Sequence, residues 1–188
     1  MKNAVILIAE GFEEIEAVTI IDTLRRGEVD IISLSVTGNL TVTGAHGIPI
    51  TCDALFDKNI AFDRDILILP GGMPGTANLS ESKDVIETIK YFYNHDKNIA
   101  AICAAPMILG KMGLLKGLKA TIYPGMEEFL RGAIRNSSSI TEFDGNMLTG
   151  KGPALALDFA LELLEIAAGE NTAYHVSTGM LKPRARIR

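Results

Sequence analysis

The sequence predicts an α/β fold in which a mostly parallel β-sheet is covered by helices on both faces. Short apolar runs recur at residues 4–9, 30–36, 65–69 and 98–102, and they lack the polar alternation expected of half-exposed strands. Segments with helical periodicity lie between these runs. Strands that alternate with helices indicate right-handed βαβ crossovers and therefore a layered sandwich.

The predicted helices between the strands rest on apolar residues spaced three or four positions apart. Such patterns occupy residues 14–26 and 83–95, with apolar positions at Ile15, Val18 and Ile21 in the first and at Val85, Ile89 and Phe92 in the second. One interruption is different in kind: residues 40–43 and 48–51 read as two strands joined by a Gly-rich turn, with Pro49 confining its strand to an edge or a bulge. We therefore expect a small β-hairpin insertion in the βαβ series.

The C-terminal part is predicted to be helical. A long helix should begin after Gly152 and Pro153, because proline suits a first helical turn, and should end at Gly169. Residues 171–180 are expected to form a shorter helix. A loosely ordered basic tail should follow, carrying Lys182, Arg184, Arg186 and Arg188.

Length and composition favour a single domain that spans residues 1–188. The chain has 47% hydrophobic residues, and it shows neither internal repeats nor a low-complexity tract. Its net charge of −5 and its scattered basic residues argue against nucleic acid or a membrane as partner. The longest apolar run, residues 99–109, is shorter than the roughly 18 residues that a membrane span needs.

A cytoplasmic protein with reduced cysteines is the expectation from the N-terminus and the cysteine count. Residues 4–9 are too short, and the glutamates that follow too acidic, for a secretory signal. Cys52 and Cys103 lie in different local contexts, and a reducing compartment would keep both as thiols. Neither the cysteines nor the three histidines show metal-ligand spacing, so no metal site is expected.

Cys103 is the candidate reactive residue. It follows the predicted strand at 98–102 directly and precedes a helical stretch that begins after Pro106, in the outline of a nucleophile elbow. Ligands bind at this edge of open α/β sheets. Helix N–H groups there would lower the thiol pKa below the usual value of about 8.5. The competing interpretation is a buried cysteine that serves only as a small apolar residue.

Two further segments should meet Cys103 at the same edge of the sheet. Gly71 and Gly72 follow the strand at 65–69, and their backbone N–H groups could stabilise an oxyanion beside the sulfur, although a plain turn would look the same. Glu13 and Glu16 share a face of the first helix, and a desolvated carboxyl there could shuttle protons. Most of the other glutamates in this segment are expected to be solvated.

Taken together, these motifs resemble the ThiJ/PfpI superfamily, and within it the parkinsonism-associated deglycase subfamily. The resemblance spans nearly the whole chain, and it is carried in order by Glu-Glu-x-Glu at 13–16, Leu-Pro-Gly-Gly at 69–72, Ala-Ala-Ile-Cys-Ala-Ala-Pro at 100–106 and Gly-Pro at 152–153. It implies a flavodoxin-like three-layer sandwich that forms a homodimer. It also implies that Cys103 is an oxidisable nucleophile whose partner carboxyl is Glu16.

The resemblance adds a set of expected pocket residues around this pair. The backbone donors would come from Gly71, Gly72 and Ala104, and the pocket would be lined by Glu13, His46, Tyr123, Gly152 and Pro153. His46 stands where relatives often place an arginine near the dimer interface and the pocket mouth, and an ordinary loop histidine is an equally good interpretation.

Departures from the family pattern narrow the expected chemistry. Some relatives carry a histidine directly after the cysteine, and others carry one before a proline further along; here these positions are Ala104 and Tyr123. A protease dyad and a Cys-His-Glu triad are therefore disfavoured. The fitting activity is a glyoxalase III or deglycase reaction on methylglyoxal or glycation adducts, without metal, glutathione or other cofactor. The alternatives are a non-enzymatic redox sensor or chaperone that responds through Cys103, and, by analogy of fold alone, a flavin carrier.

Overall fold

The computed structural model describes residues 1–136 and 138–182, and its centre is a seven-stranded sheet with the order β10-β11-β7-β6-β1-β2-β5. Adjacent strands are parallel except for the β10–β11 pair. The strands are β1 (Ala4–Ile8), β2 (Ile31–Ser35), β5 (Ala54–Leu55), β6 (Ile66–Leu69), β7 (Asn98–Ile102), β10 (Thr141–Asp144) and β11 (Met147–Gly150). The predicted mostly parallel sheet is thereby confirmed.

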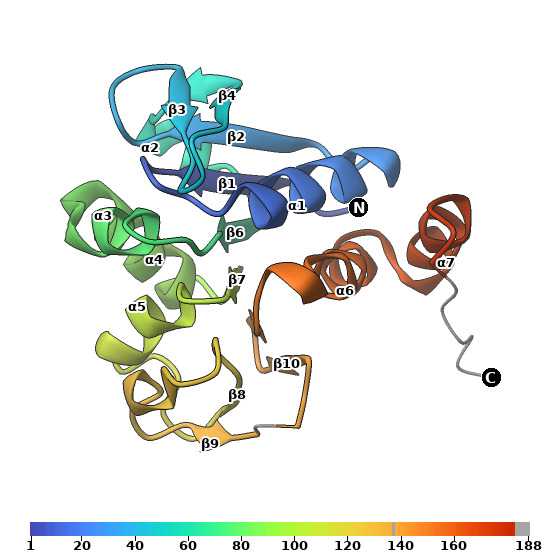
Figure 1. The fold of residues 1–188 in the computed structure, drawn as a ribbon. Coiled ribbons are helices and arrows are strands. Elements are labelled where there is room, and N and C mark those ends of the chain that lie inside the picture. Colours follow the sequence, from blue (N-terminus) through green and yellow to red (C-terminus); the bar gives the residue numbers. More distant parts are fainter. Residues whose placement is uncertain (137, 183–188) are drawn as a thin grey trace.

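Helices cover both faces of the sheet, as Figure 1 shows. One face packs against α1 and α6, through residues such as Ile20 and Phe159, and the other packs against α4 and α5, through residues such as Phe92 and Leu109. The helices are α1 (Glu14–Arg26), α2 (Lys58–Phe62), α3 (Gly75–Glu81), α4 (Lys83–Asn94), α5 (Pro106–Lys111), α6 (Ala156–Ala168) and α7 (Glu170–Gly179). Two 3₁₀ turns, η1 (Glu127–Phe129) and η2 (Pro153–Leu155), complete the helical elements.

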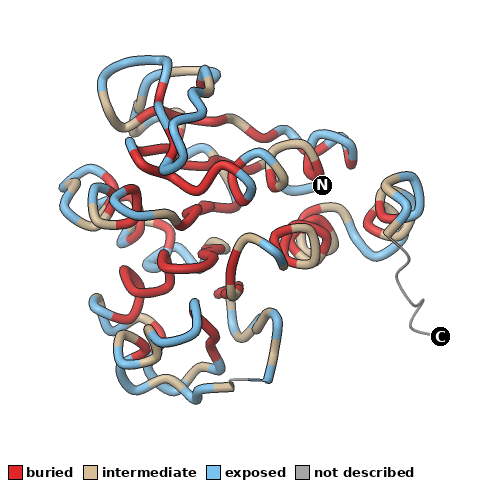
Figure 2. The backbone as a smooth tube through the Cα atoms, in the orientation of Figure 1, coloured by how far each residue is buried: buried red, intermediate tan, exposed pale blue. Residues whose placement is uncertain are grey.

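The predicted hairpin is present as a sheet of its own. β3 (Thr41–Thr43) and β4 (Pro49–Thr51) pair antiparallel, with Val42 opposite Ile50. Figure 2 shows that most of this hairpin is exposed, whereas the central strands are buried. A second small sheet joins β8 (Lys119–Ala120) to β9 (Ile134–Arg135).

Helix α1 lies where the sequence predicted it, but of the three apolar positions that indicated it only Ile21 packs against the core. Its buried apolar residues are Ala17, Ile20 and Leu24, whereas Ile15 is 58% and Val18 48% exposed. The sequence of this helix carries apolar residues on two sides, and helical spacing alone does not tell which side packs against the sheet. The outward stripe therefore needs a different explanation from core packing.

At the C-terminus, Pro153 begins the 3₁₀ turn η2 and α6 itself starts at Ala156. Helix α7 packs on α6. Lys182 pairs with Asp158 at 3.1 Å, and the rest of the predicted basic tail lies outside the described residues. Among the helices of the described chain, none is long and apolar enough to span a bilayer.

Strand order decides where the functional segments meet. β7, β6 and β1 are neighbours in that order and run parallel, so the segments that follow Ile102, Leu69 and Ile8 converge on one edge of the sheet. These are the segments that carry Cys103, the glycine turn and the glutamates.

Candidate active site

Cys103 lies on the sharp turn between β7 and α5. Its φ of 61° is in the left-handed region, which residues with a Cβ rarely adopt, and this conformation turns the chain at the end of the strand. The backbone is fixed on both sides, because its N–H donates to the Gly150 carbonyl and its carbonyl accepts from the Tyr123 N–H, both at 2.9 Å. The elbow outline that the sequence predicted is therefore present.

Glu16 is completely buried beneath the glycine turn. Its Oε2 accepts a hydrogen bond from the Gly71 N–H at 2.8 Å. A Cβ on Gly71 would lie 2.6 Å from the Cys103 Cβ and 2.8 Å from Glu16 Oε2, so glycine is required for the thiol and the carboxyl to approach each other here. Gly71 thus differs from the predicted oxyanion donor, because its N–H holds the carboxyl group.

Gly72 and Ala104 are the backbone donors that reach the Cys103 sulfur. The Gly72 φ of 93° is accessible to glycine, and a Cβ there would lie 2.4 Å from the Glu13 nitrogen. These two N–H groups come from the turns after β6 and β7, so the sulfur sits between two strand ends. Such donors stabilise negative charge on the sulfur or on an oxygen bound to it.

The pKa of the Cys103 thiol corrects an expectation from the sequence. Burial, followed by the charge of Glu16 and the hydrogen bond with it, raises the pKa to about 12, and this outweighs the opposing backbone donors. The sequence suggested a lowered value, because it showed the turn but not that the thiol is 9% exposed beside a buried carboxyl.

Glu16 has a pKa raised to about 7. Burial is the main cause, the hydrogen bonds from Gly71 and Cys103 oppose it, and the charge of Glu13 adds to it. Within the described chain, its Oε1 atom is buried without a hydrogen-bond partner of good geometry. A carboxyl group that changes charge near neutral pH can exchange a proton with a neighbouring thiol or with a substrate.

An open pocket of about 580 Å³ lies above the thiol. It is lined by several of the predicted residues, namely Glu13, His46, Gly72, Cys103, Ala104, Tyr123 and Pro153. Gly152 instead supports the wall, since a Cβ there would lie 3.3 Å from the Tyr123 ring. Prediction from sequence missed the lining residues Ile15, Ala45, Met73 and Met126. No chemical motif marks them; they are apolar residues on loops or on the outward face of α1.

The predicted solvation of the glutamates is wrong for Glu14, which is 6% exposed. Its Oε1 accepts the His46 and Ile48 N–H groups at 2.7 and 3.4 Å, and its Oε2 lies 2.8 Å from His46 Nδ1. Burial raises the pKa of Glu14, but the hydrogen bonds with His46 and Ile48 outweigh it, so the pKa is lowered overall. His46 thus joins the hairpin to α1 at the pocket mouth, and its pKa is raised by its bond to Glu14 and by the charge of Glu13.

Glu13, Glu14 and His46 also bear on the expectation of a metal-free site. Their ligand atoms lie within 4.8 Å of one another, which is compatible with holding a metal ion. The oxygens of Glu14 already accept the hydrogen bonds that fix the hairpin. Metal independence therefore stays a prediction.

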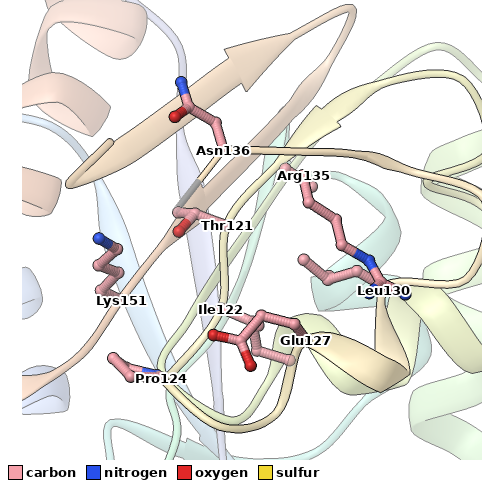
Figure 3. Close-up of a pocket in the computed structure, with 9 residues that line it drawn as sticks. Thr121, Ile122, Pro124, Glu127, Leu130, Arg135, Asn136 and Lys151 are labelled. Atoms are coloured by element: carbon pink, nitrogen blue, oxygen red, sulfur yellow. The ribbon is translucent and has the colours of Figure 1, made fainter. Parts of the chain in front are cut away.

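A second, smaller cavity of about 150 Å³ lies beneath the loop that follows Tyr123. Figure 3 shows Glu127, Arg135 and Lys151 around it, with Thr121 between them. Pro124 and Lys151 adjoin Tyr123 and Gly152 in the chain, so this cavity neighbours the cysteine pocket. Glu127, Arg135 and Lys151 line this smaller cavity only and not the cysteine pocket.

The fold and the site define a class of protein: a flavodoxin-like α/β sandwich with a cysteine on an elbow and a buried carboxyl group beside it. Residues 2–166 match the family described as the DJ-1/PfpI family. The chain belongs to the DJ-1/PfpI family.

Individual relatives agree with this assignment. The chain is 32% identical over 184 residues to "Protein dj-1beta" of Drosophila melanogaster, covering 96% of this chain and 97% of the relative. It is 37% identical over 177 residues to "Protein DJ-1 homolog B" of Arabidopsis thaliana, covering 94% of this chain. The chain spans less than half the length of the two Arabidopsis relatives, 40% and 46%.

Solved structures match the fold over nearly the whole chain. The crystal structure of Drosophila melanogaster DJ-1beta superposes with a TM-score of 0.92 at 32% identity, covering 97% of this chain and 99% of that one. Oxidized Toxoplasma gondii DJ-1 gives a TM-score of 0.89 at 32% identity, covering 96% and 98%.

Proposed function

We propose that this protein is a cysteine-dependent glyoxalase III or deglycase-type enzyme that acts on methylglyoxal and related oxoaldehyde adducts, and so limits carbonyl and oxidative stress. One observation carries the proposal: the Cys103 thiol lies beside a buried carboxyl group with a pKa of about 7, at the floor of an open pocket. Converting an oxoaldehyde to a hydroxy acid oxidises one carbon and reduces its neighbour. This reaction requires a nucleophile and a group that transfers protons.

The thiol becomes reactive by passing its proton to Glu16. This transfer removes the Glu16 charge that raises the pKa of Cys103, and it leaves the thiolate with the Gly72 and Ala104 N–H donors. Thiol plus carboxylate and thiolate plus carboxylic acid hold the same single proton, so the two residues titrate as a coupled pair. The second form is the reactive one.

The reaction then balances with no added redox partner. The thiolate attacks the aldehyde carbon C1 of methylglyoxal, forming an S–C bond, and Glu16 gives its proton to the aldehyde oxygen. The Glu16 carboxylate removes the hydrogen at C1 as a proton, an enediol forms, and the proton returns at C2. C1 is thereby oxidised to a thioester while C2 is reduced to an alcohol. Water cleaves the thioester, which releases lactate and restores the thiol.

Deglycation uses the same intermediates. A hemithioacetal or hemiaminal formed between methylglyoxal and a thiol or amine offers the same C1 carbon, and the original thiol or amine is the leaving group. Both activities are therefore assigned to Cys103 and Glu16.

Turnover of methylglyoxal tests the proposal. Purified protein should convert methylglyoxal to lactate, and both Cys103→Ala and Glu16→Gln should lower kcat by about 100-fold or more, because each removes a group that takes part in covalent or proton-transfer steps. Cys52→Ala is the matched control, because Cys52 does not line the pocket and its loss should leave turnover unchanged. Full activity in either site variant would overturn the proposal.

A redox sensor or chaperone is the second candidate, supported by the two N–H donors on the sulfur and by the relative described as oxidized Toxoplasma gondii DJ-1. Peroxide would convert the thiolate to sulfenic and then sulfinic acid, whose oxygens would take these donors. A peroxide-dependent gain of two oxygens at Cys103, without consumption of methylglyoxal, would favour this function over catalysis.

We further propose that the protein acts as a cytoplasmic homodimer, built from single domains spanning residues 1–188, that binds neither nucleic acid nor membranes. Its exposed apolar residues on α1 and the hairpin support the dimer: Val18 is 48% and Ile48 56% exposed, and Val18 and Ile50 line one shallow hollow of about 250 Å³. Exposed apolar side chains beside charged ones such as Asp22 and Arg25, which line the same hollow, are typical of protein interfaces with a polar rim.

A further inference from the structure

The pocket above Cys103 is much larger than methylglyoxal. Its volume of about 580 Å³ falls in the range of roughly 300–1,000 Å³ that suits drug-sized ligands, whereas methylglyoxal has only three carbons. A substrate carbonyl placed at the sulfur therefore leaves most of the pocket for a substituent. The side chains around that space indicate which substituent fits.

Three apolar or aromatic lining residues, called here the apolar wall, belong to segments that are joined to the cysteine: Met73, Tyr123 and Met126. Met73 is 57% exposed and follows Gly72, the donor to the sulfur, and Tyr123 is 46% exposed. The Tyr123 N–H donates to the Cys103 carbonyl at 2.9 Å, and the Met126 N–H donates to the Tyr123 carbonyl at 3.1 Å. These bonds join the backbone of Tyr123 and Met126 to the backbone of the cysteine turn.

The side chains of this wall suit an aromatic group. Methionine is flexible and polarisable and makes favourable contacts with aromatic rings, and the tyrosine ring offers a face or edge for stacking. An apolar substituent would also cover side chains that are otherwise exposed to water. Each buried CH₂ group contributes about fourfold to affinity.

The charges around the pocket disfavour an anionic substituent. Among the described residues that line it, there is no lysine or arginine. The imidazole of His46 is already 2.8 Å from Glu14 Oε2, and Glu13 adds a second carboxylate 3.7 Å from the same ring. Arg135 and Lys151 lie around the neighbouring cavity instead.

We propose that Met73, Tyr123 and Met126 form a subsite for an apolar substituent, above all an aromatic one, on an α-oxoaldehyde whose aldehyde carbon bonds to Cys103. This inference rests on the proposed function. It predicts that arylglyoxals are better substrates than methylglyoxal, and that an aryl ring carrying a carboxylate is a poorer substrate than the unsubstituted ring.

Initial rates on three compounds test the subsite: methylglyoxal, phenylglyoxal and 4-carboxyphenylglyoxal, measured before arginine side chains react. The ratio of kcat/KM for phenylglyoxal to that for methylglyoxal should exceed about ten in the unmodified protein. Met73→Ala and Met126→Ala should each lower this ratio about three- to tenfold. Met180→Ala, at the residue that follows helix α7, should leave the ratio unchanged, because Met180 does not line the pocket. Because Met126 also packs against the core, the exposed Met73 provides a variant that keeps the fold.

Alkylation of Cys103 provides a readout that does not need turnover. The rate with N-benzyl iodoacetamide, divided by the rate with iodoacetamide, should exceed one and should fall in Met73→Ala but not in Met180→Ala. A carboxylate on the benzyl ring should reverse the preference.

The two assays separate the subsite from the proposed function. If methylglyoxal is turned over but neither ratio responds to the methionine variants, the subsite is wrong and the proposed function stands. If no oxoaldehyde is turned over but the benzyl preference depends on Met73, the subsite stands and the proposed function falls. A preference for 4-carboxyphenylglyoxal over phenylglyoxal would overturn the subsite in either case.

Discussion

Glu16 shows at the scale of one residue how burial links function to stability. Its folded pKa of about 7 lies above the ordinary value of 4.5, so between these pH values the folded chain holds a proton that the unfolded chain has lost. The stability of the folded state therefore falls as the pH rises from about 4.5 to about 7. The residue to which we assign proton transfer thus destabilises the fold once it is ionised.

We expect Glu16→Gln to flatten this pH dependence. The amide has no charge to lose, so the free energy of unfolding of the variant, relative to wild type, should increase by roughly 3 kcal/mol between pH 4.5 and pH 8, as the shift implies. Urea unfolding at a series of pH values measures this difference. Glu128→Gln is the control, because Glu128 is exposed and should show no such trend. Parallel curves for wild type and Glu16→Gln would contradict a raised pKa at Glu16.

Metal removal is the second test at this scale. Dialysis against a chelator should leave methylglyoxal turnover unchanged, because the proposed chemistry uses the thiol, the carboxyl and backbone N–H groups. Loss of activity that Zn²⁺ restores in wild type, but not in a His46→Ala variant, would instead assign an ion to Glu13, Glu14 and His46.

At the scale of elements, several hydrogen bonds hold the β3–β4 hairpin to the loop before α1 and to its first turn. Glu14 accepts the His46 and Ile48 N–H groups, and the Gly11 and Ala45 N–H groups donate to the Thr43 and Phe12 carbonyls at 2.8 Å. A Cβ on Gly44 would lie 2.3 Å from the Glu14 carboxyl carbon, so the turn closes tightly on that side chain. The pocket mouth therefore depends on Glu14.

Glu14→Ala should destabilise the protein by about 1–3 kcal/mol, because the His46 N–H loses its buried acceptor. It should also lower the pKa of His46 toward its ordinary value, since its strongest partner is gone. Urea unfolding and an NMR titration of the histidine ring measure the two effects, with Glu128→Ala as the control. An unchanged free energy of unfolding and an unchanged His46 pKa would show that the hydrogen bonds of Glu14 do not stabilise the protein.

The sequence predicted elements better than it predicted contacts. Four parallel strands, α1, α4 and the hairpin follow from local patterns and lie within a few residues of their predicted positions. The antiparallel pair β10 and β11 and the short strands β5, β8 and β9 were missed, because runs of two to four residues carry little periodicity. The Cys103 and Glu16 positions followed from motifs, whereas the outward stripe of α1, the burial of Glu14 and the Met73 and Met126 wall depend on tertiary packing.

For the molecule as a whole, Val18 on α1 and Ile48 and Ile50 on the hairpin lie on the proposed dimer surface. Val18→Arg should place a charge in this surface and shift the protein toward a monomer, because an unpaired buried charge is costly. Sedimentation equilibrium across a range of concentrations measures the shift. Ile134→Arg, at a similarly exposed apolar position on β9, should leave the mass unchanged. A monomeric wild type, or a Val18→Arg protein of unchanged mass, would overturn this interface.

The hydrogen bond from the Cys103 N–H to the Gly150 carbonyl also orders events during synthesis. The elbow gains this restraint only after β11 has left the ribosome, at least 47 residues after the cysteine itself. At roughly 5–20 residues per second, the nascent thiol passes several seconds without it. The cysteine is therefore synthesised before the strand that fixes its turn, and β11, the last strand of the sheet in chain order, completes the support of a residue made long before it.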